Sequence, residues 1–386
     1  MRSYAIVSCS VALGMVFGFP VLSRAEGGDD VDAARAAALA SEANFESIRT
    51  YKCRYIITKA NAASADQALR GNYTNAQKCE FSLAVDREKT KLETVTRLDT
   101  TPPKNKQEIV NPNNGEKVKV YSTPFIPLGE LRNGETSLSY ARQWRQAQII
   151  KQRTDLAGET PFEELYWRPS GGLKSWRNAV EQGRGRISSG GQTIEKGRAV
   201  IGLQYNLDSL EVSLRFDPSQ GYLPVHIVLK SLTGGGRAHE NHTVLLEAKE
   251  VGKGRWFPMH VVSFSAPEAE GQSLHIRDLH VTEITVDKVT DADLALQVSA
   301  GTTIFRQDMP VGSGEYITLQ QDEKIGPADI AKIEATCKEA GSRGAGDRTV
   351  KLSKNRRNWK WYSLGAGLVL MVLTAVLYRR YRRRSA

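Results

Sequence analysis

A period of two in the apolar residues, repeated in many short segments, constrains this chain more than any other feature. In "YKCRYIIT", residues 51–58, apolar side chains alternate with polar ones, and "KCEFSLAVD", residues 78–86, repeats the pattern. Successive side chains of a β-strand point to opposite faces of a sheet, so this alternation is typical of strands with one buried face. "EVSLRFD" and "YLPVHIVLK" alternate in the same way on either side of a "DPSQG" turn.

Further strands are predicted in "KLETVTRL", "KVKVY", "AVIGLQYNL", "TVLLEAKEV", "MHVVSFS" and "LHIRDLHVTEITVDKV". The result is a meander of about ten strands. Strands that follow one another through short turns pair antiparallel, and clean alternation favours a sheet with one solvated face. The expected fold class is therefore mainly antiparallel β with some α, an α+β chain.

Helical patterns occur at three places. The alanine-rich segment from about Asp30 to Ile48 predicts a helix leading into the first strand. Between Pro124 and Gly183 the meander is interrupted, and "SLSYARQWRQAQIIKQ", "PFEELYW" and "LKSWRNAVEQG" predict a helical insertion, either a lid at one rim or a small subdomain. After Pro327, "GPADIAKIEATCKEAG" predicts a short helix followed by a flexible linker.

The positive charge of the chain is concentrated at its C-terminal end. The formal net charge is +10, yet ten of the 53 Lys and Arg lie between Lys351 and Ala386, where there is no acidic residue. The preceding 350 residues hold the other 43 basic residues and all 43 acidic ones. Because the excess charge flanks an apolar run and no stacking motif accompanies it, we expect contact with lipid head groups and no nucleic-acid binding.

That apolar run, Trp359–Leu377, contains no charged side chain except Lys360 near its start, and aromatic residues frame both of its ends. Its length just meets the roughly twenty residues that span a bilayer. At the other end, residues 1–25 combine Arg2, an apolar stretch and small residues before Glu26, which indicates a cleaved export signal. We therefore expect a single-pass protein of the cell membrane, with an exported body (periplasmic if bacterial) and residues 378–386 as a basic cytoplasmic tail.

Three cysteines remain after cleavage of the signal, namely Cys53, Cys79 and Cys337. Cys53 and Cys79 lie on similar apolar strand faces, and in a long hairpin they would sit opposite one another. We expect a disulfide between them, which would stabilise the fold by roughly 3 kcal/mol; two buried thiols are the alternative. Cys337, on a helix that looks exposed, is expected to be a free thiol, and a disulfide between two protomers is the alternative.

Catalytic chemistry finds little support in the sequence. All six histidines lie between His226 and His280, but "HENH" lacks the i, i+4 spacing of a zinc-binding helix, so solvated strand histidines are expected. G-x-S-x-G, S-x-x-K, phosphate-loop and dinucleotide-binding patterns are absent. Neither an enzyme nor a cofactor is predicted.

Several segments resemble the LolA-like superfamily of periplasmic lipoprotein-localisation and lipid-binding proteins. They are "SIRTYKCRYII", "FSLAVDREKTKLETV", "DPSQGYLPVHIVL", "GKGRWFPMHVV" and "VDKVTDADLALQVSAGTTIF", within residues 30–308. The last two are similar to the family's W-x-P strand and to its closing strand with a Gly-Thr turn, here Gly301 and Thr302. The chain departs from the family at Ala300, often a proline, at Leu294, often an aromatic residue, and in its large insertion and membrane span.

The resemblance implies an open half-barrel or strongly curved sheet whose concave apolar face accepts acyl chains under a helical lid. The alternating strands supply the candidates for that face, which serve equally well as an ordinary packed core: Tyr51, Tyr55, Ile57, Phe81, Leu83, Val85, Val212, Leu214 and Phe216.

The sequence thus divides into a signal peptide (1–25), an exported β-rich domain (26–308) with an insertion at about 124–183, a C-terminal helix and linker (309–358), a transmembrane helix (359–377) and a tail (378–386). The leading hypothesis is a membrane-anchored module that holds a lipid, a lipoprotein or another apolar ligand. The alternative is a structural or sensory envelope protein that binds a protein partner through the insertion or a sheet edge.

Overall fold

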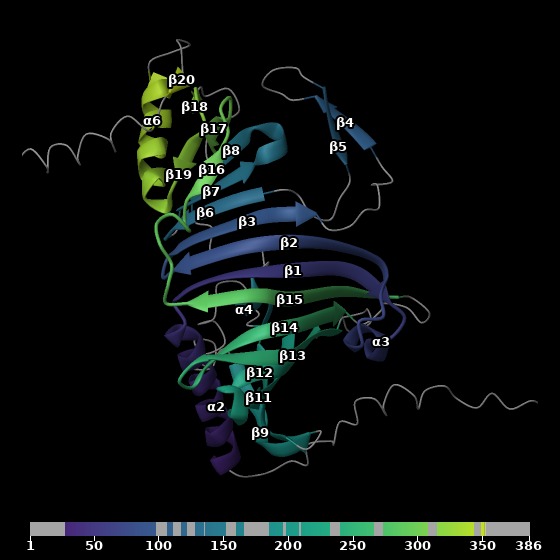
Figure 1. The fold of residues 1–386 in the computed structure, drawn as a ribbon. Helices are drawn as coiled ribbons and strands as arrows, with labels where there is room; N and C mark the ends of the chain where they lie inside the picture. Colours follow the sequence, from purple (N-terminus) through teal and green to yellow (C-terminus); the bar gives the residue numbers. More distant parts are fainter. Residues whose placement is uncertain are drawn as a thin grey trace, which may run out of the picture.

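One open, curved sheet organises the chain (Figure 1). The computed structural model describes residues 28–97, 106–110, 117–121, 128–134, 136–151, 160–165, 185–195, 198–207, 210–231, 240–265, 273–307, 315–342, 349–350 and 352. Among these residues the main sheet has sixteen strands, in the order β20-β18-β17-β8-β7-β6-β3-β2-β1-β15-β14-β13-β12-β11-β10-β9.

The first half of the chain supplies β1 (Thr50–Ala62), β2 (Thr74–Asp86), β3 (Lys89–Arg97), β6 (Leu128–Asn133), β7 (Thr136–Ala141) and β8 (Gln146–Lys151). The second half supplies β9 (Gly185–Glu195), β10 (Arg198–Leu207), β11 (Leu210–Asp217), β12 (Leu223–Ser231), β13 (Glu240–Gly252), β14 (Arg255–Ser265), β15 (Leu274–Val286), β17 (Thr303–Arg306), β18 (Tyr316–Leu319) and β20 (Thr349–Val350). Two small sheets pair β4 (Lys106–Val110) with β5 (Lys117–Tyr121), and β16 (Leu296–Val298) with β19 (Glu323–Ile325).

Antiparallel pairing of neighbours in the chain dominates the sheet, as the alternating pattern predicted. β1 to β3 and β9 to β15 form two such runs, and the pairing of β15 with β1 joins them, from Tyr51 opposite Val286 to Ala62 opposite Leu274. The pairs β8–β17 and β18–β20 are parallel. The sheet has two free ends in its strand order and is not closed into a barrel.

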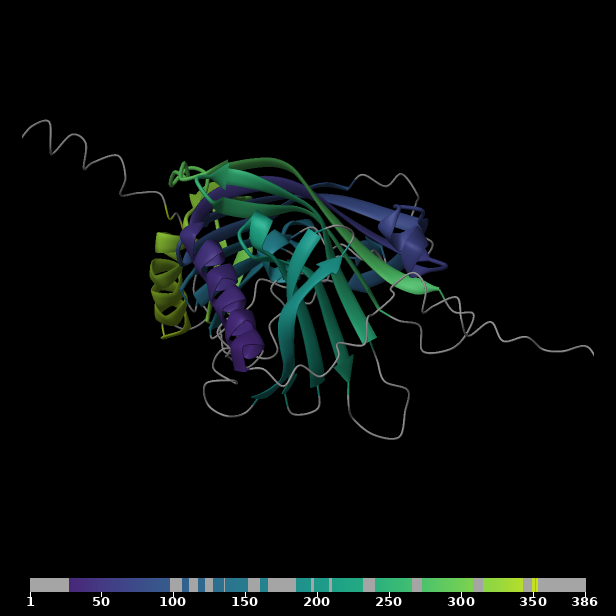
Figure 2. The same cartoon turned by 90° about the horizontal axis from the view of Figure 1, so that it is seen from below.

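The N-terminal helix α2 (Gly28–Ser47) lies on the inner side of the arch that the sheet forms (Figure 2). Its buried residues Ala34, Ala37 and Ala38 pack against the strand residues of β10 to β12. Small side chains let the helix approach the sheet closely, and alanine also has the highest helix propensity. The predicted helix from about Asp30 to Ile48 is confirmed.

Side-chain hydrogen bonds and a tight turn hold the C-terminal end of α2 against the sheet. Asn44 donates from Nδ2 to the Trp256 carbonyl (2.9 Å) and accepts at Oδ1 from the Trp256 N–H (2.8 Å). Its side-chain amide thus makes the same pair of hydrogen bonds that a residue of a neighbouring strand would make. Gly221 adopts φ +62° in the "DPSQG" turn beside it, and a Cβ there would approach Trp256 Cδ1 to 2.8 Å. Only glycine combines this backbone angle with that close contact.

The insertion between Pro124 and Gly183 differs from its prediction. The segment "SLSYARQWRQAQIIKQ" does not form a helix; it forms β7, the short 3-10 helix η2 (Arg142–Trp144) and β8. The pairs Leu138 with Tyr140 and Ala147 with Ile149 are spaced by two and are buried, so tertiary packing outweighed the helical propensity of the intervening Arg and Gln residues. "PFEELYW" does contain a helix, α4 (Pro161–Leu165), whereas "LKSWRNAVEQG" lies largely outside the described residues.

A C-terminal layer covers the side of β6 to β8 that faces away from the inner side of the arch. It contains β16, β19, the 3-10 helix η4 (Pro327–Asp329) and the predicted helix after Pro327, α6 (Ile330–Ser342). Leu131, Leu138 and Tyr140 are buried against its Ile330 and Ile333. β18 and β20, which follow residue 308, belong to the main sheet.

The predicted membrane-related segments lie outside the described residues. These are residues 1–25 and the apolar run Trp359–Leu377. None of the helices in the described part of the chain has both the length and the apolar composition needed to cross a bilayer.

Candidate ligand-binding face

One side of the curved sheet carries a continuous apolar surface, here called the inner face. Most of the predicted candidates lie on it: Tyr51, Tyr55, Ile57, Phe81 and Leu83 are at most 5% exposed and form one cluster, and the partly buried Val85 packs against them. The register of β1 with β2 explains this, because it places Tyr55 opposite Phe81 and Tyr51 opposite Val85. Tyr55 and Phe81 stack with ring centroids 5.4 Å apart.

The remaining three candidates lie in a second cluster. Val212, Leu214 and Phe216 on β11 are buried together with the alanines of α2. The helix therefore covers this part of the sheet, while the first cluster lies beyond its C-terminal end, where Phe45 packs against it. The structure thus divides the nine predicted residues between two neighbouring hydrophobic clusters.

The helix α4 fills the centre of the inner face. Its buried side chains Phe162 and Leu165 belong to the same cluster as Tyr51 and Tyr55. The Phe162 ring makes edge-to-face contacts with Phe45 and Phe257, both at 4.7 Å between centroids, and with Tyr51 at 5.8 Å. Such pairs add about 0.5–1.5 kcal/mol each to the burial of the rings.

The nine predicted candidates do not include the part of the inner face that β14 and β15 form. Phe257, Met259 and Val261 alternate on β14, and Leu279 and Val281 follow on β15. The period of two in "FPMHVV" carried the signal, since both segments were predicted as strands. Phe162 and Leu165 gave no comparable signal, because a helix of five residues shows no full period.

The predicted Cys53–Cys79 disulfide is wrong. Both cysteines lie on the inner face, but the hairpin pairs Cys53 with Leu83 and Cys79 with Ile57. The offset of four residues separates their Cα atoms by about 13 Å along the strands, whereas a disulfide requires less than about 7 Å. Both thiols are buried and neither is part of a disulfide, and burial raises the pKa of Cys53.

Cys337 is free, as predicted, but it is not exposed. It is fully buried in the C-terminal layer, where its thiol donates to the Ile304 carbonyl (3.6 Å). Burial raises the pKa of this thiol to about 12. A protonated thiol inside an apolar cluster is a poor nucleophile and a poor partner for another protomer.

Histidines line the opposite, outer face of β12 to β15. His226 Nε2 lies 3.2 Å from His242 Nδ1, and the His242 ring stacks on Phe264 at 4.9 Å. Burial lowers the pKa of His242, and the nearby Glu240 carboxylate opposes that effect. Within the described ranges, no three His, Cys, Asp or Glu side chains gather in a way that would hold a metal ion.

A second polar group on the outer face centres on Asp278. Its carboxylate lies 2.7 Å from His260 Nε2 and accepts a hydrogen bond from the Tyr73 hydroxyl at 2.8 Å. Partial burial, followed by the adjacent Asp278 charge, raises the pKa of Tyr73. These residues tie the turn before β2 to β14 and β15.

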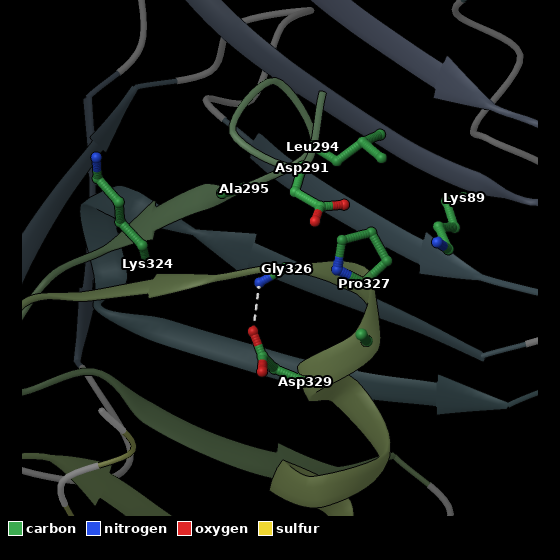
Figure 3. Close-up of a pocket in the computed structure, with 9 residues that line it drawn as sticks. Lys89, Asp291, Leu294, Ala295, Lys324, Gly326, Pro327 and Asp329 are labelled. Atoms are coloured by element: carbon green, nitrogen blue, oxygen red, sulfur yellow. Dashed lines mark hydrogen bonds between the residues drawn. The ribbon is translucent and has the colours of Figure 1, made fainter. Parts of the chain in front are cut away.

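A small pocket lies between the main sheet and the C-terminal layer (Figure 3). Its volume of about 60 Å³ has room for little more than water. Lys89 and Lys324 stand on opposite sides of it, and Asp329 accepts the Gly326 N–H at 2.8 Å, which closes the start of the helical segment. An acyl chain does not fit here.

Comparison with known proteins yields similar solved structures. Neither a family model nor a curated protein matches the chain. In structure it is similar to a putative outer membrane lipoprotein-sorting protein domain from Vibrio parahaemolyticus, with a TM-score of 0.40, 10% identity, and coverage of 67% of this chain and 96% of that one. A LolA superfamily protein from Nitrosomonas europaea gives a TM-score of 0.35 at 10% identity, with 67% and 96% covered.

A third similar structure is a DUF1329 family protein from Desulfovibrio piger, with a TM-score of 0.38, 10% identity, and coverage of 68% of this chain and 96% of that one.

Proposed function

We propose that this chain is an exported, membrane-tethered, non-enzymatic binding module that holds a lipid, a lipoprotein or another apolar ligand on its inner face. Trp359–Leu377 would be the tether, and residues 26–358 would lie outside the cytoplasm. The filling of the inner face by α4 is the observation that carries the proposal. The resemblance of the sequence motifs to LolA-like proteins implies the same class of ligand.

The helix α4 is short, with only five residues. A helix of five residues has almost no stability of its own, so α4 is held by the burial of Phe162 and Leu165. These two side chains present to the sheet the same kind of apolar surface that an acyl chain would present. An acyl chain that displaces them replaces one set of apolar contacts with another and leaves no strand pairing broken.

Photolabelling of the full chain tests this proposal. The chain is reconstituted in nanodiscs with a fatty acid that carries a diazirine in its acyl chain, irradiated, and digested for mass spectrometry. Adducts on inner-face residues of β1, β2 and β14 are the expected result. Adducts confined to Trp359–Leu377, or spread evenly over inner and outer faces, would contradict the proposal.

A protein partner is the second candidate function. β9 ends the main sheet, and its eleven residues pair with β10 on one side only within the described part of the sheet. Such an edge accepts an added strand from another chain. Crosslinking in cells that returns one specific protein, and loses it when Gln192 on β9 is replaced by proline, would favour this function over ligand binding.

A further inference from the structure

The inner face changes from apolar to polar along two rows of residues that cross the strands. One row runs through β15, β1, β2, β3, β6, β7 and β8 as Val286, Tyr51, Val85, Thr90, Arg132, Ser137 and Ile150. The next row runs as Ile284, Cys53, Leu83, Leu92, Glu130, Ser139 and Gln148. In the first row the polar residues begin with Thr90 on β3, and in the second they begin with Glu130 on β6, the strand next to β3. Thr90, Glu130, Arg132 and Ser137 are called the polar patch below.

Three residues of the polar patch are buried, which is unusual for polar side chains, and Arg132 is half-buried. Thr90 is 5% exposed, Glu130 3% and Ser137 0%. The Ser137 hydroxyl has no hydrogen-bond partner among the described residues. Buried polar atoms are nearly always satisfied, so one without a partner calls for an explanation such as a ligand.

The opposite side of the same strands shows that the pattern is specific to the inner face. Leu131 and Leu138 alternate with the patch residues, face the C-terminal layer and are fully buried. Strands covered on both faces normally carry apolar residues on both. On the inner side of β6 and β7 only the terminal pair Leu128 and Ala141 is apolar, so the rest of that side is matched to something polar.

We propose that the polar patch binds the head group of a phospholipid whose acyl chains lie on the apolar part of the inner face. Arg132 would bind the phosphate oxygens, and the Glu130 carboxylate would accept from an ammonium or hydroxyl group beyond the phosphate. The two residues are two positions apart on one strand face, about 7 Å, so one head group reaches both. Ser137 would donate its hydroxyl to the phosphate. This inference rests on the proposed function.

The test compares two photoactivatable probes with the full chain in nanodiscs. One probe is phosphatidylethanolamine and the other is a long-chain alcohol, each with a diazirine in the chain. Arg132→Gln removes a charge-assisted hydrogen bond, so phospholipid labelling of the inner face falls by about tenfold. Labelling by the alcohol stays unchanged, because its chain does not contact Arg132.

Arg54→Gln is the matched control, since Arg54 lies on β1 with an exposed side chain, paired loosely with Glu283 at 4.0 Å. It should leave the labelling by both probes unchanged. Equal phospholipid labelling of the Arg132 and Arg54 variants would overturn the head-group site. Absence of inner-face labelling by both probes in the unmodified chain would instead overturn the proposed function itself.

Ser137→Ala provides a second test of the site in case the Arg132→Gln variant does not fold. Removal of a buried hydroxyl that lacks a partner should leave the melting temperature equal or higher, yet lower the phospholipid labelling. A purely structural role would move both quantities in the same direction. A phosphatidylglycerol probe, with a hydroxyl in place of the ammonium, shows which of the two phospholipid head groups binds better. Stronger labelling by either phospholipid supports the site. Labelling by both phospholipids that is insensitive to Ser137→Ala contradicts it.

Discussion

Single residues decide how the N-terminal helix is docked. Asn44 is 8% exposed and satisfies both the N–H and the carbonyl of Trp256, although 212 residues separate them in the chain. No periodic pattern in the sequence predicts this role of Asn44, because its partner Trp256 lies on a strand much later in the chain.

Asn44→Ala should lower the free energy of unfolding by about 1–3 kcal/mol, because two partly buried backbone groups of Trp256 lose their partner. Thermal unfolding followed by circular dichroism measures this. Asn206→Ala, at an exposed position of β10, is the control and should change stability little. Equal stability of the two variants would mean that the Asn44 hydrogen bonds contribute nothing.

His242 should make the fold sensitive to mild acid. Burial lowers its pKa in the folded chain below the ordinary value of 6.5, so the unfolded chain binds the proton more readily. The stability is therefore full above about pH 6.5 and falls as the pH drops below it. The groups around the ring are His226 and Glu240.

The measurement is the fall in melting temperature between about pH 7.5 and pH 5.5. His242→Gln should reduce this fall, whereas the exposed His275→Gln should leave it unchanged. A fall of the same size in both variants would assign the acid sensitivity to other groups.

The three cysteines should be unreactive until the chain unfolds. Cys53, Cys79 and Cys337 are at most 4% exposed, and burial keeps the thiols of Cys53 and Cys337 protonated. Intact-mass analysis after iodoacetamide treatment should find no modification at these three positions in the native chain and all three after denaturation, without reductant. A Cys53–Cys79 pair that needs reductant before it reacts would contradict the observed register.

At the scale of elements, α4 is the part of the inner face most easily changed. Phe162 is buried among three aromatic rings, yet it belongs to a helix of five residues. Its removal therefore costs core packing, and at the same time it opens the surface that we propose for ligands.

Phe162→Ala should destabilise the chain by about 3–5 kcal/mol and increase diazirine fatty-acid labelling of β1 and β14. Leu246→Ala is the control, because Leu246 is 41% exposed, and it should change neither quantity. A destabilised Phe162 variant with unchanged labelling would indicate that α4 is an ordinary part of the core.

At the scale of the whole molecule, the C-terminal layer belongs to the same folded unit as the strands before it. Ile317 and Leu319 on β18 and Ile330 and Ile333 on α6 are at most 1% exposed and pack against β6 to β8. A boundary near residue 308, expected from the fading alternation, would cut through this cluster.

A chain that ends at residue 308 should therefore aggregate or lose its cooperative unfolding transition, because Leu131, Leu138 and Tyr140 become exposed. A chain that ends at residue 358 should keep the transition. Gel filtration and thermal unfolding compare the two. A monomeric, cooperatively folded 308-residue chain would restore the boundary at that position.

Local patterns in the sequence were sufficient to predict the strands at residues 51–58, 78–86, 211–217 and 222–230, the two long helices and the antiparallel sheet. Alternation is a local property, and it survives wherever one face of a strand is buried. The same alternation identified the inner-face residues of β1, β2 and β11, because membership of a face depends only on odd or even position.

Tertiary structure alone decided the rest. The four-residue offset that separates Cys53 from Cys79 is a matter of register between strands, which periodicity leaves open. The strands β7 and β8 formed in a helix-like sequence because the C-terminal layer, built from residues after 295, covers them. The filling of the inner face by Phe162, and the change from apolar to polar along its rows, arise where distant segments meet, and no local pattern encodes such a meeting.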